Sequence, residues 1–204
     1  SLKEKIKIAD VKVLINLYNS EGKKIWSFKD VVKVNNRGIF PIPLDKLKFG
    51  INEEFSLGWI EVFREFKLHC SKGTTRPQIM IFTDDSSCAV HGQDVGTSLG
   101  GSHTSIYRPS IDTQILAFIN PSKKNLNILL NNPLEFESTE IRKKEEVDLN
   151  IPPKGAVFQI LNDDKRFDKL NEKYFSLNWV GSGRYKSYIY CFSKDFKFVS
   201  LDHL

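Results

Sequence analysis

The feature that most constrains the fold is an alternation of apolar and polar residues with a period of two. It begins at residues 6–18 (IKIADVKVLINLY), where β-branched or other apolar side chains recur at nearly every second position. Successive side chains of a strand point to opposite faces of a sheet, so this spacing is typical of a strand with one buried face. Further segments with this character follow at 24–34, 59–63, 78–82, 115–120, 125–132, 146–151, 156–161, 175–180, 186–192 and 196–201.

Turn signals separate these short segments, and they indicate how the strands are connected. Residues 20–23 (SEGK) lie between two alternating segments and predict a β-hairpin. Only residues 43–50 and 163–175 allow a short helical turn. Many short strands with almost no helix predict an all-β protein of the sandwich or barrel class.

An internal similarity suggests that the chain contains the same unit twice. Residues 55–59 (FSLGW) match residues 175–179 (FSLNW), and a strand, a turn and a second strand precede each copy. Trp59 and Trp179 are therefore expected to anchor the cores, because such large rings dominate a small sandwich core. We predict two similar tandem β-sandwich units, Ig-like or jelly-roll-like. They are either separate modules or two halves that close on one shared core.

The predicted boundaries follow from this similarity. The first β-sandwich unit covers residues 1–95, a glycine-rich connection covers 96–110, and the second unit covers 111–204. The first copy differs from the second by two longer connections, at 64–77 and 91–109. Long connections without evident secondary structure are often functional, so we expect the function to reside there.

Charge and cysteine content favour some classes of protein over others. The formal charge is +5, but most lysines alternate with apolar residues, as on the solvent face of a strand, and no basic cluster predicts nucleic-acid binding. The three cysteines form no C-x-x-C pair, which favours buried free thiols in a reducing compartment. No apolar run reaches the ~18 residues of a membrane-spanning helix. We therefore expect a cytoplasmic protein without a nucleic-acid or membrane partner.

The glycine-rich stretch at 90–109 (VHGQDVGTSLGGSHTSIYRP) carries the candidate binding residues. Its polar and aromatic side chains could bind a small polar ligand, such as a carbohydrate, on the end loops of a sandwich. The predicted ligand-binding residues are His91, Gln93, Asp94, His103, Tyr107 and Arg108.

A divalent metal is the alternative ligand, because imidazole and carboxylate groups are the ligands that zinc and iron accept. His91, Asp94 and His103 would supply three ligands, with His69, Cys70 or Cys88 as a fourth. The competing interpretation is that these histidines hydrogen-bond to loop backbone. We therefore expect either no cofactor or a divalent metal ion.

Other chemistry has less support in this stretch. It lacks the Gly-Lys-Ser/Thr of a phosphate-binding loop and the G-x-S-x-G of a hydrolase nucleophile. The leading hypothesis is a non-catalytic binding or assembly protein that recognises a small polar ligand or a protein partner through the loops of the first unit. Association through sheet edges could also produce a homo-oligomer. The alternative is a metal-dependent enzyme, or a degenerate relative of one, that uses His91, Asp94 and His103.

Overall fold

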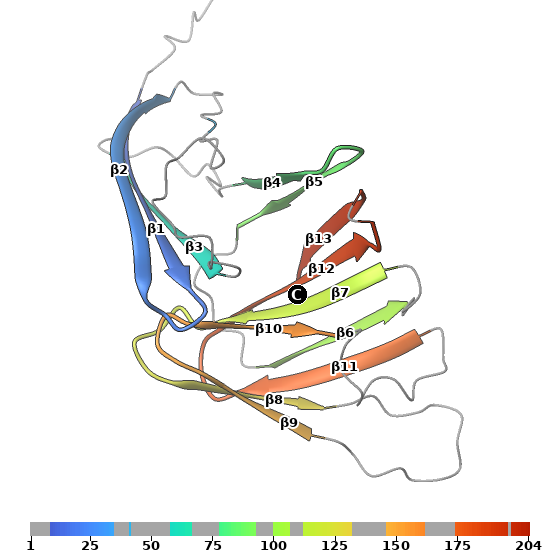
Figure 1. Cartoon of the computed structure of the whole chain (residues 1–204). Coiled ribbons are helices and arrows are strands. Elements are labelled where there is room, and N and C mark those ends of the chain that lie inside the picture. The colour runs from blue at the N-terminus through green and yellow to red at the C-terminus, as the bar shows by residue number, and fades with distance from the viewer. Residues whose placement is uncertain are drawn as a thin grey trace, which may run out of the picture. The chain divides into compact units, whose positions relative to one another are not determined.

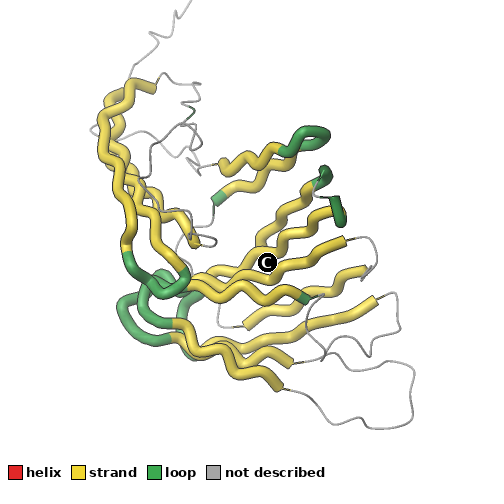
Figure 2. Tube along the Cα trace, viewed as in Figure 1, coloured by secondary structure: helices red, strands yellow, loops and turns green. Residues whose placement is uncertain are grey.

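The protein is all-β, as predicted. The computed structural model describes residues 9–34, 41, 58–66, 78–92, 100–106, 112–131, 146–161, 174–195 and 197–204. Within these ranges the chain forms antiparallel strands and turns but no helix (Figures 1 and 2). The strands are β1 Ala9–Asn19, β2 Lys24–Val34, β3 Gly58–Phe66, β4 Gln78–Phe82, β5 Ser87–His91, β6 Gly100–Ile106, β7 Asp112–Ile119, β8 Leu126–Asn131, β9 Glu146–Ile151, β10 Ala156–Ile160, β11 Tyr174–Gly181, β12 Lys186–Ser193 and β13 Val199–His203.

The chain forms two compact units. One consists of Ser1–Asn19 with Lys23–Thr75, and the other of Ser20–Gly22 with Arg76–Leu204. The units predicted from sequence, 1–95 and 111–204, have different bounds. β4, β5 and β6 lie in the same compact unit as β7–β13, because β6 pairs with β11 and β5 lies beside β13. In the part of the chain that is described, no helix is both long and apolar enough to cross a membrane.

The first unit contains a three-stranded antiparallel sheet in the order β2-β1-β3. The predicted hairpin turn at 20–23 is confirmed between β1 and β2. In this turn Gly22 has φ +83°, a conformation that side-chain-bearing residues rarely adopt, and the Lys23 backbone N–H donates to Asn19 Oδ1 at 2.8 Å. One face of the sheet is a hydrophobic core of Val11, Val13, Ile15 and Val32.

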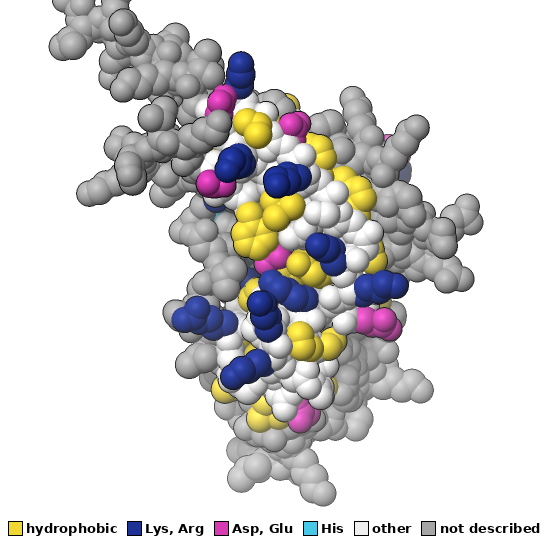
Figure 3. Space-filling model, turned by 90° about the vertical axis from the view of Figure 1, so that its left-hand side faces the viewer, with side chains coloured by type: hydrophobic (Ala, Val, Ile, Leu, Met, Phe, Trp, Pro, Cys, Tyr) yellow, Lys and Arg dark blue, Asp and Glu magenta, His cyan; other side chains and the backbone are white. Residues whose placement is uncertain are grey.

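The opposite face of this sheet mixes charged, polar and apolar side chains. Lys12 Nζ lies 2.9 Å from Glu65 Oε2, and Phe63 remains 49% exposed between charged neighbours on its strand. Figure 3 shows one face of the molecule, where lysine and arginine side chains are interspersed with hydrophobic ones. The lysines of this sheet thus alternate with other residue types, in line with the period-two pattern of the sequence.

The second unit contains two four-stranded antiparallel sheets, β10-β7-β12-β13 and β6-β11-β8-β9, with a β-sandwich-like arrangement (Figure 1). Both sheets contribute side chains to one hydrophobic core. Phe118 of β7 meets Trp179 of β11 edge-to-face at 5.4 Å between ring centroids, and it meets Tyr185 at 6.0 Å. The other fully buried side chains of this core are Leu116, Leu126, Ile128, Leu130, Ile151, Leu161 and Leu177.

Part of the glycine-rich stretch is a strand rather than a loop. Residues Gly100–Ile106 form β6, and Gly101 is the register partner of Trp179. A Cβ atom at Gly101 would lie 2.9 Å from the Trp179 indole, closer than real Cβ contacts come. Glycine at this position therefore leaves room for the large Trp179 ring. From the sequence alone, a glycine needed for packing could not be distinguished from a glycine of a loop.

The two tryptophans of the internal similarity are both buried, Trp59 at 9% exposure and Trp179 at 1%. Trp179 belongs to the core of the second unit as predicted, whereas Trp59 lies on the sheet face opposite the Val11, Val13 and Ile15 core. Their strands have different neighbours, since Trp59 pairs with Tyr18 of β1 whereas Trp179 pairs with β6 and β8. The tandem repeat stays a prediction. The possible helical turns at 43–50 and 163–173 lie outside the described residues, and Tyr174 and Phe175 begin β11.

Replacing Gly101 by alanine should destabilise the second unit, because the added methyl group forces the Trp179 ring out of its packed position. Overpacking of this kind costs about 1–3 kcal/mol of unfolding free energy. Gly183→Ala is the matched control, since a Cβ there would meet Leu126 at an ordinary 3.7 Å. Urea denaturation of both variants measures the difference. Equal stability of the two variants would contradict the close packing of Gly101 on Trp179.

Candidate functional site

The β4–β5 hairpin is the part of the described chain that combines a fixed position with an exposed apolar surface. Its strands pair from Gln78 opposite His91 to Phe82 opposite Ser87. Val90 is buried, whereas Met80 and Phe82 on the other face are 56% and 68% exposed. Ile79, the register partner of Val90, is 39% exposed, so the face of Val90 is partly buried, whereas the face of Met80 and Phe82 is turned to solvent.

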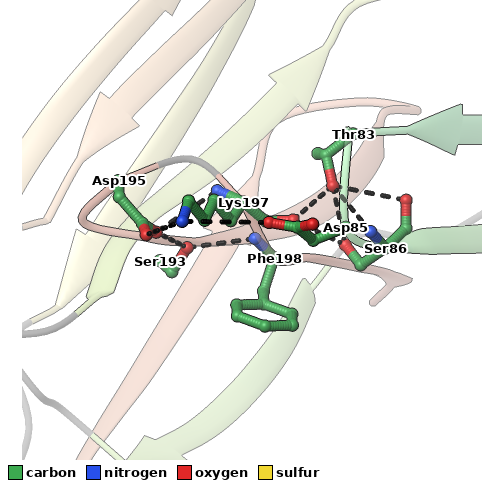
Figure 4. Close-up of polar contacts among 7 residues, drawn as sticks. All are labelled: Thr83, Asp85, Ser86, Ser193, Asp195, Lys197 and Phe198. Carbon is green, nitrogen blue, oxygen red and sulfur yellow. Dashed lines mark hydrogen bonds and ion pairs between the residues drawn. The ribbon is translucent and has the colours of Figure 1, made fainter.

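Polar contacts fasten the turn of this hairpin to the connection between β12 and β13 (Figure 4). The Lys197 carbonyl oxygen accepts hydrogen bonds from the Thr83 hydroxyl and from Ser86 Oγ, the latter at 3.0 Å. Ser86 Oγ in turn accepts from the Val199 backbone N–H at 3.1 Å. We call Thr83, Ser86 and the Lys197 carbonyl the hairpin clasp. It joins residues more than 100 positions apart in the sequence.

Charged side chains surround the clasp. Lys197 Nζ lies 3.8 Å from Asp195 Oδ2 and 4.0 Å from Asp85 Oδ2, and all three side chains are at least half exposed. Hydrogen bonds from the Ser193 hydroxyl and then from the Lys197 backbone N–H lower the pKa of Asp195. Exposed ion pairs contribute little stability, so the hydroxyl-to-carbonyl bonds are the specific part of this contact.

An aromatic group on β12 lies close to the buried face of the hairpin. Burial raises the pKa of Tyr190 to about 12, and the neighbouring Tyr188 and Cys88 add to this rise. Cys88 belongs to β5, which places the inner face of the hairpin near β12. Tyr190 also stacks on Phe192, with ring centroids 6.4 Å apart. Cys88 and Cys191 are half-buried thiols, and Cys70 lies outside the described residues.

At the other end of the hairpin, His91 contacts a histidine that the sequence analysis did not select. The rings of His91 and His203 lie 4.3 Å apart between centroids and are tilted by 52°. His203 is on β13, so the packing of β5 beside β13 brings together two residues from distant parts of the chain. No local spacing signals this pair, because it depends on the tertiary arrangement of the strands.

Of the residues predicted to bind a ligand or metal, His91 and Cys88 have described side chains. Gln93, Asp94, Tyr107 and Arg108 lie outside the described residues, as do the predicted extra ligands His69 and Cys70. The backbone of His103 lies on β6 opposite Leu177, in a different sheet from β5, and its side chain is not described. The predicted site of His91, Asp94 and His103 therefore stays a prediction. Within the described ranges, no three His, Cys, Asp or Glu side chains form a metal-binding group.

No protein-family model, curated protein or solved structure matches the chain.

Removal of the Ser86 hydroxyl, which belongs to the clasp, should weaken the attachment of the hairpin. Ser86→Ala deletes both the donor to the Lys197 carbonyl and the acceptor for the Val199 N–H, and each lost hydrogen bond costs about 0.5–1.5 kcal/mol. We expect faster limited proteolysis within residues 78–91 and a lower melting temperature. Ser200→Ala is the control, since Ser200 is an exposed serine on β13, next to Val199. Equal proteolysis of the two variants would show that the clasp does not hold the hairpin.

The raised pKa of Tyr190 predicts a loss of stability in alkali. The folded protein keeps the Tyr190 proton up to about pH 12, whereas the unfolded chain releases it near the ordinary tyrosine value of about 10. The unfolded state therefore binds fewer protons in this window, and stability falls as the pH rises through it, by an amount on the order of 1–3 kcal/mol. Urea unfolding across the window should show a smaller decline for Tyr190→Phe. An identical pH dependence in the variant would contradict the burial of this hydroxyl.

Proposed function

We propose that the chain is a non-catalytic binding or assembly protein whose β4–β5 hairpin receives an extended segment of a protein partner. The observation that carries the proposal is the exposure of β4, where four of the five residues are exposed. Three of those four are large and hydrophobic: Ile79 is 39% exposed, Met80 56% and Phe82 68%. Exposed apolar residues grouped on one short element are typical of an interaction surface.

The backbone of β4 supports the same mode of binding. Among the described strands, β4 pairs with β5 and with no other. The unpaired N–H and C=O groups of an edge strand can form a ladder with an added strand, and the side chains next to it provide selectivity. The clasp supports such a role as well, because a fixed hairpin loses little conformational entropy when a partner strand binds.

The charge of the hairpin indicates the chemistry of the partner. Residues 78–91 contain Asp84 and Asp85 at the turn and no lysine or arginine. A strand added to β4 places every second side chain on the face of Met80 and Phe82. Lys197 Nζ already lies 4.0 Å from Asp85, so the partner segment that fits best is extended, apolar at alternate positions, and basic where it passes Asp84.

A further exposed ring lies close to the clasp. Phe198 is 59% exposed and follows the residue whose carbonyl oxygen holds the hairpin. Its ring points away from the polar contacts in Figure 4, and its backbone N–H donates to Ser193 Oγ at 3.0 Å. Exposed aromatic rings are common anchors in protein interfaces, so Phe198 is a second candidate contact for the partner.

Selection from a displayed peptide library on the immobilised full chain tests this proposal. The expected result is enrichment of peptides with alternating apolar residues and a basic residue. Their affinity should fall at least about tenfold in the Met80→Ser/Phe82→Ser double variant, because two central apolar contacts are lost. Val180→Ser is the matched control, since Val180 is 59% exposed on β11.

Two results would contradict the proposal. One is enrichment of peptides whose binding survives the double substitution. The other is binding to a neutral glycan array with no peptide selected, which would favour a small polar ligand instead. Self-association that Met80→Ser/Phe82→Ser abolishes, measured by sedimentation, would identify the bound segment as part of a second copy of the chain.

A further inference from the structure

We propose that His91 and His203 form a binding site for a divalent transition-metal ion, which links β5 to β13. The two imidazole rings come from separate strands and meet at 4.3 Å between centroids. Imidazole nitrogens are the commonest protein ligands for zinc, copper and nickel. The proposal does not depend on partner binding by β4, because neither Met80 nor Phe82 is required for it.

The hydrogen bonding of this pair supports a ligand shared by both rings. The Nδ1 atoms of His91 and His203 are both buried, and neither has a hydrogen-bonding partner among the described residues. Buried polar atoms without partners are rare in native structures, and a bound ion or water is a common explanation. We infer that one ion binds both rings, whose centroids lie 4.3 Å apart.

The surroundings favour a cation. Asp202 Oδ1 lies 3.3 Å from His203 Nδ1, but not in hydrogen-bonding geometry, so its negative charge is close to the proposed ion. The His203 side chain is 35% exposed, so the pair lies near the surface of the second unit. Two imidazoles provide two ligands, and water molecules would complete the coordination shell. This agrees with the finding that no three-ligand group occurs in the described part of the chain.

The ligand type sets the expected order of affinities. Nitrogen and oxygen donors bind Cu²⁺ more tightly than Ni²⁺ and Zn²⁺. Because Mg²⁺ and Ca²⁺ prefer oxygen ligands, they should bind weakly at a pair of imidazoles. This site differs from the one predicted from sequence, since it shares His91 with that prediction but replaces Asp94 and His103 by a residue at the end of β13.

Titration of the full chain, purified without a histidine tag, with Cu²⁺, Ni²⁺, Zn²⁺ and Mg²⁺ tests the proposal. We expect one saturable site for the three transition metals, a raised melting temperature, and Cu²⁺ electron paramagnetic resonance showing coupling to two nitrogens. Loss of even an outer-shell partner costs about 10- to 100-fold in metal affinity, so His203→Asn should weaken binding at least about tenfold. His103→Asn is the matched control and should bind as the unchanged chain does.

The variants distinguish this site from the one predicted from sequence. If His103→Asn abolishes binding and His203→Asn does not, the pair is not the site. Absence of saturable binding to the unchanged chain also overturns the proposal. If His203→Asn fails to fold, the number of coupled nitrogens in the unchanged chain decides the question, because a single coupled nitrogen rules out the pair.

Discussion

The edge-to-face contact between Phe118 and Trp179 is the interaction on which the second unit depends. It joins the two four-stranded sheets at a centroid distance of 5.4 Å, and both rings are almost fully buried. Such rings contribute more to a small core than any other side chain. Gly101 completes the arrangement, because its missing side chain lets the Trp179 indole lie against β6. The central packing thus also explains part of the glycine-rich stretch.

The candidate site lies outside this core but depends on its position. The sandwich fixes β12 and β13, and the hairpin of β4 and β5 is attached to them by the clasp at its turn and by the two histidines at its open end. An isolated two-stranded hairpin is marginally stable in water, so these attachments give it a defined place. They leave Met80 and Phe82 exposed, and this combination of fixed backbone and exposed apolar side chains underlies the proposed function.

The sequence predicted the fold class and most strands, because alternation with a period of two is a local signal; β5 and β6 lack that signal and were not predicted. The hairpin at 20–23 followed from its turn residues, and the burial of Trp59 and Trp179 from the size of their rings. Strand pairing is not local, and this limited the prediction of the site. Nothing in the sequence near His91 indicates that His203 faces it, and the clasp joins Ser86 to Lys197 across 111 positions. The role of Gly101 likewise depends on a strand partner far along the chain.

Amide hydrogen exchange on the unchanged full chain tests the central claim most directly, which is that the β4–β5 hairpin is held on the second unit. Amides that bond across the hairpin, within residues 78–91, should exchange much more slowly than those of an unstructured chain, because opening them requires the clasp to break. The amides on the outward edge of β4 should exchange fast. Fast exchange throughout residues 78–91, beside slow exchange in β7 and β11, would show that the hairpin is not held and would contradict the claim.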